Sequence, residues 1–223
     1  MFENEKPIQT DKLHDQVFQR LCTLLREGEF TPGKAVPVAQ VSKAFGVSAM
    51  PVREALTRLT ALGVLTNVSG RSVGVPDVSH EDLADLRNVR LELECTATRW
   101  AVQNSDDGFL ADLESILGDL HRAETDQDEK GFIKNNYAFH FRLYQQAYSP
   151  ILLEIIDTLW LRVSPHLYFA GGPKRHRMSN EEHRTIIEAV RVGDPDAACA
   201  ALVSDISGAY DDLVQALFKS QAV

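Results

Sequence analysis

The sequence predicts a mostly α-helical protein, built as an N-terminal winged helix-turn-helix followed by an all-α helical bundle. Two observations predict this class. Residues before about 78 alternate short helical patterns with turn signals, whereas later residues show long helical patterns with few breakers and no long period-two stretch. A chain of 223 residues is long enough for two modest domains. We therefore expect a head at 1–78 and a body at 79–223.

The head is expected to contain three helices and a two-stranded hairpin. Apolar residues recur at helical spacing in three segments, and each segment ends at a glycine, namely Gly28, Gly46 and Gly63. The following stretch, VLTNVSGRSVGVP, indicates two short strands around a Ser69-Gly70 turn. Two short helices joined by a tight glycine turn and followed by a hairpin are the parts of a winged helix-turn-helix.

A helix that enters the major groove should carry polar or basic side chains on its exposed N-terminal half. Ser48 and Arg53 occupy this part of the third helix, and Arg58 follows one and a half turns later. Arg71 lies near the tip of the expected wing, where it could meet the minor groove or the backbone. We expect these four residues to contact DNA. The alternative is a small helical domain with ordinary surface arginines.

The body is expected to hold six helices, at roughly 80–103, 107–127, 130–147, 149–171, 179–192 and 195–219. Ser79 is placed to cap the first of them, with Asp82 three residues on as in a capping box. The basic run KRHR at 174–177 precedes the fifth helix and is expected to be a solvated loop.

Charge and cysteine usage restrict the class of protein further. The net charge is −9, but residues 1–78 carry nine Lys and Arg against eight Asp and Glu, and the remainder carries 14 against 24. Because an acidic body repels phosphates, any DNA contact should come from the head.

Cys22, Cys95 and Cys199 are far apart and indicate neither a disulfide framework nor a zinc ribbon. Without a signal-peptide pattern or a long apolar run, we expect a soluble cytoplasmic protein with no membrane contact.

Several segments resemble a known family. LHDQVFQRLCTLLREGEFTPGKAV, FGVSAMPVREALTRLTALGVL and GRSVGVPDVS are similar to the head of a GntR-type transcription regulator. The body resembles the helical effector-binding domain of the FCD branch through LRNVRLELE, NYAFH, EEHRTIIEAVRVGDPDAA and ALVSDI. The resemblance implies a homodimeric regulator, most simply a repressor, that binds palindromic double-stranded operator DNA and responds to a small carboxylate effector.

The head departs from the resembling family at two positions. Members commonly carry arginine where this chain has Ala39 and Ala49, whereas Arg53 matches the arginine of P-V-R-E-A-L. Each lost phosphate contact weakens binding and flattens its salt dependence by about one unit. We therefore expect DNA binding that is weaker or that reads a different operator.

Polar residues on otherwise apolar helices indicate a site in the body. Asn136 and His140 lie four residues apart on one helix face, His183 opens the expected fifth helix, and Asp205 lies within the last. The resemblance implies that these positions hold a divalent metal, although the family usually has Asp, His, His and His there. Two imidazoles and a carboxylate suit a borderline ion such as zinc or nickel, with Asn136 as a weak ligand or an effector contact. The alternative is two buried, hydrogen-bonded histidines, with Asp205 paired to one of them.

Two arginines are candidate effector-binding residues. Arg90 lies on the inward side of the first body helix, where a guanidinium could meet a carboxylate ligand bidentately. The alternative is an intrahelical pair with Glu94. Arg162, on the fourth body helix, is a second candidate for the pocket.

The leading interpretation is a transcription regulator whose effector changes the placement of two heads on a fixed operator spacing. A metal-dependent enzyme could use the same two histidines and aspartate to activate water, but no clearly placed general base accompanies them and the winged head would have no role. A metabolite-binding protein whose head contacts other proteins is the remaining alternative, kept open by Ala39 and Ala49.

Overall fold

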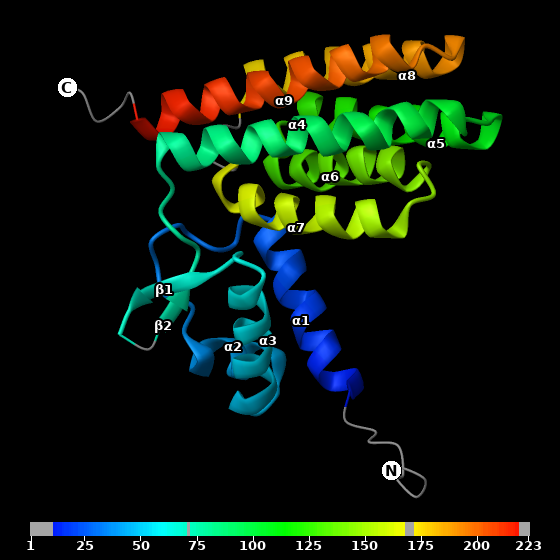
Figure 1. Cartoon of the computed structure of the whole chain (residues 1–223). Coiled ribbons are helices and arrows are strands. Elements are labelled where there is room, and N and C mark those ends of the chain that lie inside the picture. The colour runs from blue at the N-terminus through cyan, green and yellow to red at the C-terminus, as the bar shows by residue number, and fades with distance from the viewer. Residues whose placement is uncertain (1–10, 71, 168–171, 219–223) are drawn as a thin grey trace, which may run out of the picture. The chain divides into compact units, whose positions relative to one another are not determined.

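The computed structural model describes residues 11–70, 72–167 and 172–218. The chain divides into two compact units between Asp77 and Val78, except that Arg26–Gly28 group with the second unit. The first unit contains three helices and a hairpin, and the described part of the second is built from helices (Figure 1).

The first unit has the parts and the order of a winged helix-turn-helix. Its elements are α1 (Asp11–Arg26), α2 (Val38–Phe45), α3 (Ala49–Ala61), β1 (Thr66–Ser69) and β2 (Ser72–Gly74). The two strands pair antiparallel. Gly46 ends α2 with a φ of 67°, a left-handed conformation that glycine adopts without a Cβ clash and that allows the tight turn into α3. Leu21, Val52 and Leu59 are fully buried between the helices. The predicted helix–helix–helix–hairpin order is confirmed.

The second unit is a bundle of long helices that lie side by side (Figure 1). They are α4 (His80–Gln103), α5 (Asp107–Asp126), α6 (Glu129–Gln145), α7 (Pro150–Leu167), α8 (Pro173–Val192) and α9 (Pro195–Phe218). Ser79 and Asp82 form the predicted capping box at the start of α4. Leu113, Phe139 and Ile186 are fully buried in the bundle core. None of the helices in the described ranges is long and apolar enough to cross a membrane.

The start of α8 corrects the prediction for the basic run at 174–177. The helix begins at Pro173 rather than near residue 179, because a proline fits the first turn, where its missing N–H costs nothing. The basic run is therefore helical, and Arg175 and His176 are only 8% and 4% exposed. Both are buried with partners, Asp205 for Arg175 and Glu129 for His176, so the expected solvated loop is wrong.

A disulfide joins Cys95 of α4 to Cys199 of α9, which the sequence did not indicate. The two cysteines are 104 residues apart in the chain, and their Cα atoms come within 5.2 Å where α4 packs along α9. Long-range pairing of this kind depends on the tertiary fold and leaves no local spacing signal.

Candidate functional site

One face of α3 packs into the first unit and leaves the opposite face open to solvent. Residues Pro51, Val52 and Ala55 are buried, whereas Ser48 and Arg53 are exposed. Ser48 stands at the N-cap position, but its hydroxyl makes no capping hydrogen bond. The N-terminal half of α3 therefore presents a hydroxyl and a guanidinium to solvent, as a groove-reading helix needs.

Arg58 has a different environment from the one expected. Its Nη1 lies 3.2 Å from Asp15 Oδ1, and its guanidinium carbon is 3.8 Å from the centre of the Phe18 ring. Five residues along an α-helix correspond to a rotation of about 140° from Arg53, so the two arginines do not share a face. Arg58 ties α3 to α1 within the first unit. Arg71, the fourth expected DNA contact, lies outside the described residues.

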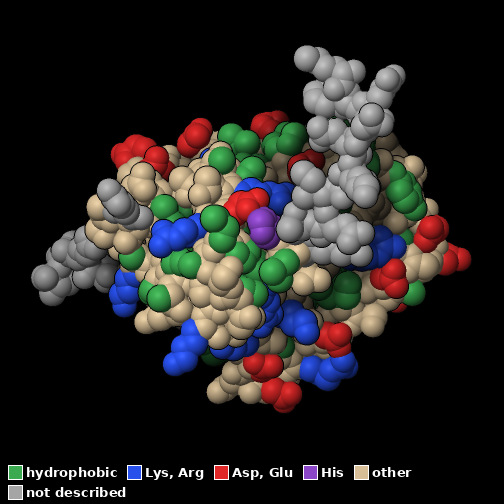
Figure 2. Space-filling view, turned by 90° about the horizontal axis from the view of Figure 1, so that it is seen from below, with side chains coloured by type: hydrophobic (Ala, Val, Ile, Leu, Met, Phe, Trp, Pro, Cys, Tyr) green, Lys and Arg blue, Asp and Glu red, His purple; other side chains and the backbone are tan. Residues whose placement is uncertain are grey.

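On the face seen in Figure 2, Lys and Arg side chains form small separate groups between hydrophobic and other side chains. Ala39 and Ala49, where the resembling family commonly has arginine, are both exposed. An arginine at either position would therefore be accessible to a phosphate, which the alanines cannot neutralise.

In the bundle, three donor atoms from three helices converge on one point. His140 of α6 and His183 of α8 bring their Nε2 atoms to 3.2 Å from each other. Asp205 Oδ2 of α9 lies 3.2 Å from His140 Nε2 and 3.7 Å from His183 Nε2. All three side chains are buried, with residue exposures of 1%, 0% and 5%.

These separations suit a metal ion. Donors bonded at 2.0–2.1 Å around a tetrahedral ion lie about 3.3 Å from one another. Two imidazoles and a carboxylate are also the donor types that zinc and similar ions select. Residues His140, His183 and Asp205 therefore fit the divalent ion that the sequence resemblance implies.

The protonation states of Asp205 and His183 also suit a metal ion. Burial raises the pKa of the Asp205 carboxyl, but the adjoining His140 and His183 imidazoles outweigh burial and hold that pKa well below its ordinary value. Burial lowers the pKa of His183, and the neighbouring Asp205 offsets only part of this effect. An ionised carboxylate beside a neutral imidazole is the protonation state that a metal requires.

The second oxygen of Asp205 is held by α8. Arg175 Nη2 lies 2.6 Å from Asp205 Oδ1, and the Ser179 hydroxyl lies 2.7 Å from the same oxygen. Gly208 of α9 gives the guanidinium room, since a Cβ there would lie 2.2 Å from Arg175 Nη1. Sequence reasoning missed Arg175. Its i, i+4, i+8 spacing with Ser179 and His183 was the signal that could have revealed it.

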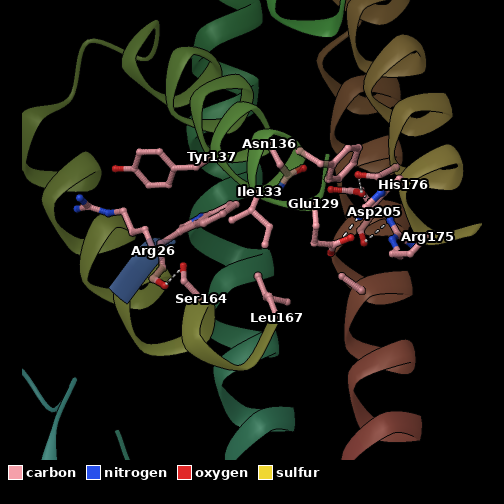
Figure 3. Close-up of a pocket in the computed structure, with 14 residues that line it drawn as sticks. Arg26, Glu129, Ile133, Asn136, Tyr137, Ser164, Leu167, Arg175, His176 and Asp205 are labelled. Atoms are coloured by element: carbon pink, nitrogen blue, oxygen red, sulfur yellow. Dashed lines mark hydrogen bonds and ion pairs between the residues drawn. The ribbon is translucent and has the colours of Figure 1, made fainter. Parts of the chain in front are cut away.

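A cavity of about 80 Å³, partly open to solvent, borders this cluster. Its walls from α6 to α9 include Phe132, Ile133, Asn136, Tyr137, Trp160, Ser164, Leu167, Arg175, His176, Ser179, Asp205 and Ala209 (Figure 3). The buried indole N–H of Trp160 has no hydrogen-bond partner among the described residues. A hollow that combines apolar walls with several polar and charged side chains can hold a small polar molecule.

The two arginines expected at the effector site lie elsewhere. Arg90 Nε is 2.7 Å from Glu94 Oε1, which is the intrahelical alternative, and Arg90 lines a separate, smaller pocket. Arg162 is on the exposed side of α7 and is not part of the cavity wall. Asn136 does line the cavity, on the α6 side (Figure 3).

Comparison with known proteins covers both units. Residues 13–75 match the bacterial regulatory proteins of the gntR family, and residues 85–208 match the FCD domain. The HTH-type transcriptional regulator McbR of Escherichia coli is 31% identical over 194 residues, which are 86% of this chain and 87% of that protein. The HTH-type transcriptional repressor NanR of Cronobacter sakazakii is 26% identical over 227 residues, covering 92% and 86%.

Solved structures agree with these matches. E. coli McbR/YncC superposes with a TM-score of 0.86 at 30% identity, over 92% of this chain and 98% of that one. A regulator from Rhodococcus sp. RHA1 reaches a TM-score of 0.77 at 21% identity, over 92% and 98%, and so shares the fold. McbR, which matches both in sequence and in structure, is named as a transcription regulator. The chain therefore belongs to the GntR family of DNA-binding transcription regulators, in the group whose C-terminal part is an FCD domain.

Proposed function

We propose that this regulator is a homodimeric repressor, released from its operator when a small carboxylate effector binds in the cavity beside a divalent metal ion. One observation carries the proposal: His140, His183 and Asp205 present three donor atoms to a single point, and Asp205 also lines the cavity. The NanR relatives are named as repressors, which supports repression rather than activation of transcription.

In this proposal, His140 Nε2, His183 Nε2 and Asp205 Oδ2 hold a zinc- or nickel-like ion. The ion would supply an electrophilic anchor for an oxygen of the effector. Asn136, on the cavity wall, would contact the effector or complete the ligand set. Neutral imidazoles and a bound carboxylate make the affinity for the metal pH-dependent.

The chain's own polar groups would orient the effector. Nη2 of Arg175 donates hydrogen bonds to Asp205. The other N–H groups of the guanidinium would donate to an anion in the cavity. The buried Trp160 N–H would gain an acceptor from the effector, which removes the cost of leaving a buried donor unpaired. A small organic acid satisfies both requirements.

The DNA-reading surface in this proposal is the exposed N-terminal half of α3, with Ser48 and Arg53. Two copies in a homodimer would read the two halves of a palindromic operator. To change the fraction of operator that is bound, the effector must favour one arrangement of the two heads over the other by about 1–3 kcal/mol.

The test uses full-length protein purified without a histidine tag. Metal content is measured by elemental analysis, and binding to duplex DNA from upstream of the chain's own gene is measured by fluorescence anisotropy at two salt concentrations. A panel of small mono- and dicarboxylic acids is then added with and without zinc. We expect bound metal, salt-dependent DNA binding, and at least one acid that weakens it.

The double variant His140→Ala/His183→Ala is the matched control. It should lose the metal and the response to the acid but bind DNA as the wild type does. A wild-type protein that holds no metal, or whose DNA binding no acid changes, would overturn the proposed effector mechanism.

A further inference from the structure

A chain of buried hydrogen bonds reaches His140 from the side opposite its metal-facing nitrogen. Arg90 Nε lies 2.7 Å from Glu94 Oε1, and the Tyr144 hydroxyl donates to Glu94 Oε2. The same hydroxyl lies 3.1 Å from His140 Nδ1. All four residues are at most 5% exposed, so water does not compete for these bonds.

The direction of these bonds follows from the number of protons available. Glu94 is paired with Arg90 and accepts only, so the single proton of the Tyr144 hydroxyl points to Glu94. The Tyr144 oxygen can then only accept from His140, which requires the proton of the imidazole to be on Nδ1. The Nε2 atom of neutral His140 is left with a lone pair.

The opposite tautomer would give up the bonds to Tyr144 and His183 and gain one to Asp205. A proton on His140 Nε2 could bond to Asp205 Oδ2, 3.2 Å away. In that tautomer, the lone pair on His140 Nδ1 would face the Tyr144 oxygen. The Tyr144 proton would not turn to Nδ1, because the Glu94 carboxylate accepts it more strongly than a neutral imidazole does. His183 can donate from its own Nε2 to the His140 lone pair, since these atoms are 3.2 Å apart.

We propose that Glu94 and Tyr144, held by Arg90, are positioning residues that fix His140 as the Nδ1–H tautomer and so present its Nε2 lone pair to the cation site. The consequence for metal affinity rests on the proposed function, but the tautomer itself is a property of the metal-free chain. Mutation of the residue that hydrogen-bonds to the far nitrogen of a metal-binding histidine typically weakens metal affinity 10–100-fold. Arg90 then serves the site from a distance instead of contacting the effector.

The first experiment measures the tautomer directly. The imidazole nitrogens of the chelator-treated, full-length protein are labelled with ¹⁵N, and their NMR shifts are recorded at a pH where histidine is neutral. We expect His140 to carry its proton on Nδ1. In Tyr144→Phe this preference should be lost, whereas Tyr148→Phe, at a residue that is 70% exposed, should leave it unchanged.

The second experiment measures zinc affinity by competition with a chromophoric chelator. Tyr144→Phe and Glu94→Gln should bind zinc about 10–100-fold more weakly than the wild type. Phenylalanine retains the aromatic ring of Tyr144, and circular dichroism of each metal-free variant shows whether it is folded. Tyr148→Phe should bind zinc as the wild type does.

The two experiments separate this inference from the proposed function. Absence of zinc binding by the wild-type protein would overturn the proposed function, and the NMR result would still decide the tautomer. Wild-type His140 protonated on Nε2 would overturn the positioning role, as would a folded Tyr144→Phe variant with unchanged tautomer or unchanged zinc affinity.

Discussion

Arg175 and Asp205 form a buried ion pair in which Nη2 lies 2.6 Å from Oδ1. This contact uses one oxygen of the carboxylate and leaves Oδ2 facing His140 and His183. Asp205 therefore joins two parts of the site, the basic start of α8 and the pair of imidazoles. A change at Asp205 should be detected both in the stability of the bundle and in its binding of metal.

The variant Asp205→Asn removes the charge while nearly keeping the shape. We expect the free energy of unfolding to fall by about 3–5 kcal/mol, because Arg175 is left as an uncompensated buried charge. Zinc binding should also be lost. Urea denaturation and chelator competition measure the two effects. Asp196→Asn, on the same helix with a side chain that is 86% exposed, should change stability by less than about 0.5 kcal/mol. An Asp205→Asn protein with the wild-type midpoint would contradict the role of the ion pair.

Gly208→Ala tests the space that Arg175 occupies. The added Cβ would lie 2.2 Å from Arg175 Nη1, and the guanidinium cannot withdraw without breaking its bonds to Asp205. Overpacking of this kind should cost about 1–3 kcal/mol, measured by urea denaturation. Gly118→Ala is the control, since a Cβ there meets nothing within 4 Å. It should stabilise α5 by about 0.5–1 kcal/mol, and equal effects of the two substitutions would argue against crowding at Arg175.

Arg53→Ala should weaken operator binding because it removes an exposed cation from α3. A contact to a base edge is worth about 1–3 kcal/mol, which is a loss of roughly 5–150-fold in affinity. Anisotropy titrations with specific and scrambled duplexes measure this loss. Arg99→Ala removes the same charge from the acidic body and should leave affinity nearly unchanged. Equal losses from both variants would indicate a general charge effect.

Ala49→Arg should strengthen DNA binding, since an arginine at this exposed position can neutralise a phosphate. The slope of log affinity against log salt should steepen by about one unit. Titrations at several salt concentrations measure the slope. Ala49→Gln, which adds length without charge, should leave it unaltered. A slope that Ala49→Arg does not change would place this end of α3 away from the DNA backbone.

The capping box at the start of α4 should make stability pH-dependent. Hydrogen bonds from the Ser79 side chain and backbone lower the pKa of Asp82 below 3.8. A carboxyl whose pKa is lower in the folded state stabilises the fold above the pKa of the unfolded chain, and this contribution is lost as the pH falls through the folded value. The gap in urea midpoint between wild type and Asp82→Asn should therefore be present at neutral pH and shrink below about pH 4. Asp85→Asn, exposed on the same helix outside the cap, is the control.

Local patterns in the sequence were sufficient for the order of elements. Gly46 ends α2 and Ser79 begins α4 with Asp82, because caps depend on residues within one turn. The six helices of the body follow from apolar spacing, and the start of α8 was the main error. That error arose because a run of four basic residues resembles a solvated loop unless a buried partner is known.

The site was predicted only in part, for a related reason. His140, His183 and Asp205 were identified with the help of the family resemblance, and the structure brings their donor atoms together. Arg175 was missed because its partner, Asp205, lies 30 residues away on another helix. Tyr144 was not among the candidate residues, because its contact with Glu94 spans 50 residues. Contacts between helices depend on packing that no local spacing encodes.

The close approach of Gly208 to Arg175 has an evolutionary consequence. A lineage that replaces the glycine with any larger residue has no room for the guanidinium, and a lineage that loses the arginine no longer needs the glycine. The two positions should therefore covary across the family, glycine accompanying arginine and bulkier residues accompanying its absence. Such a linked pair would mark those relatives that share this form of the aspartate site.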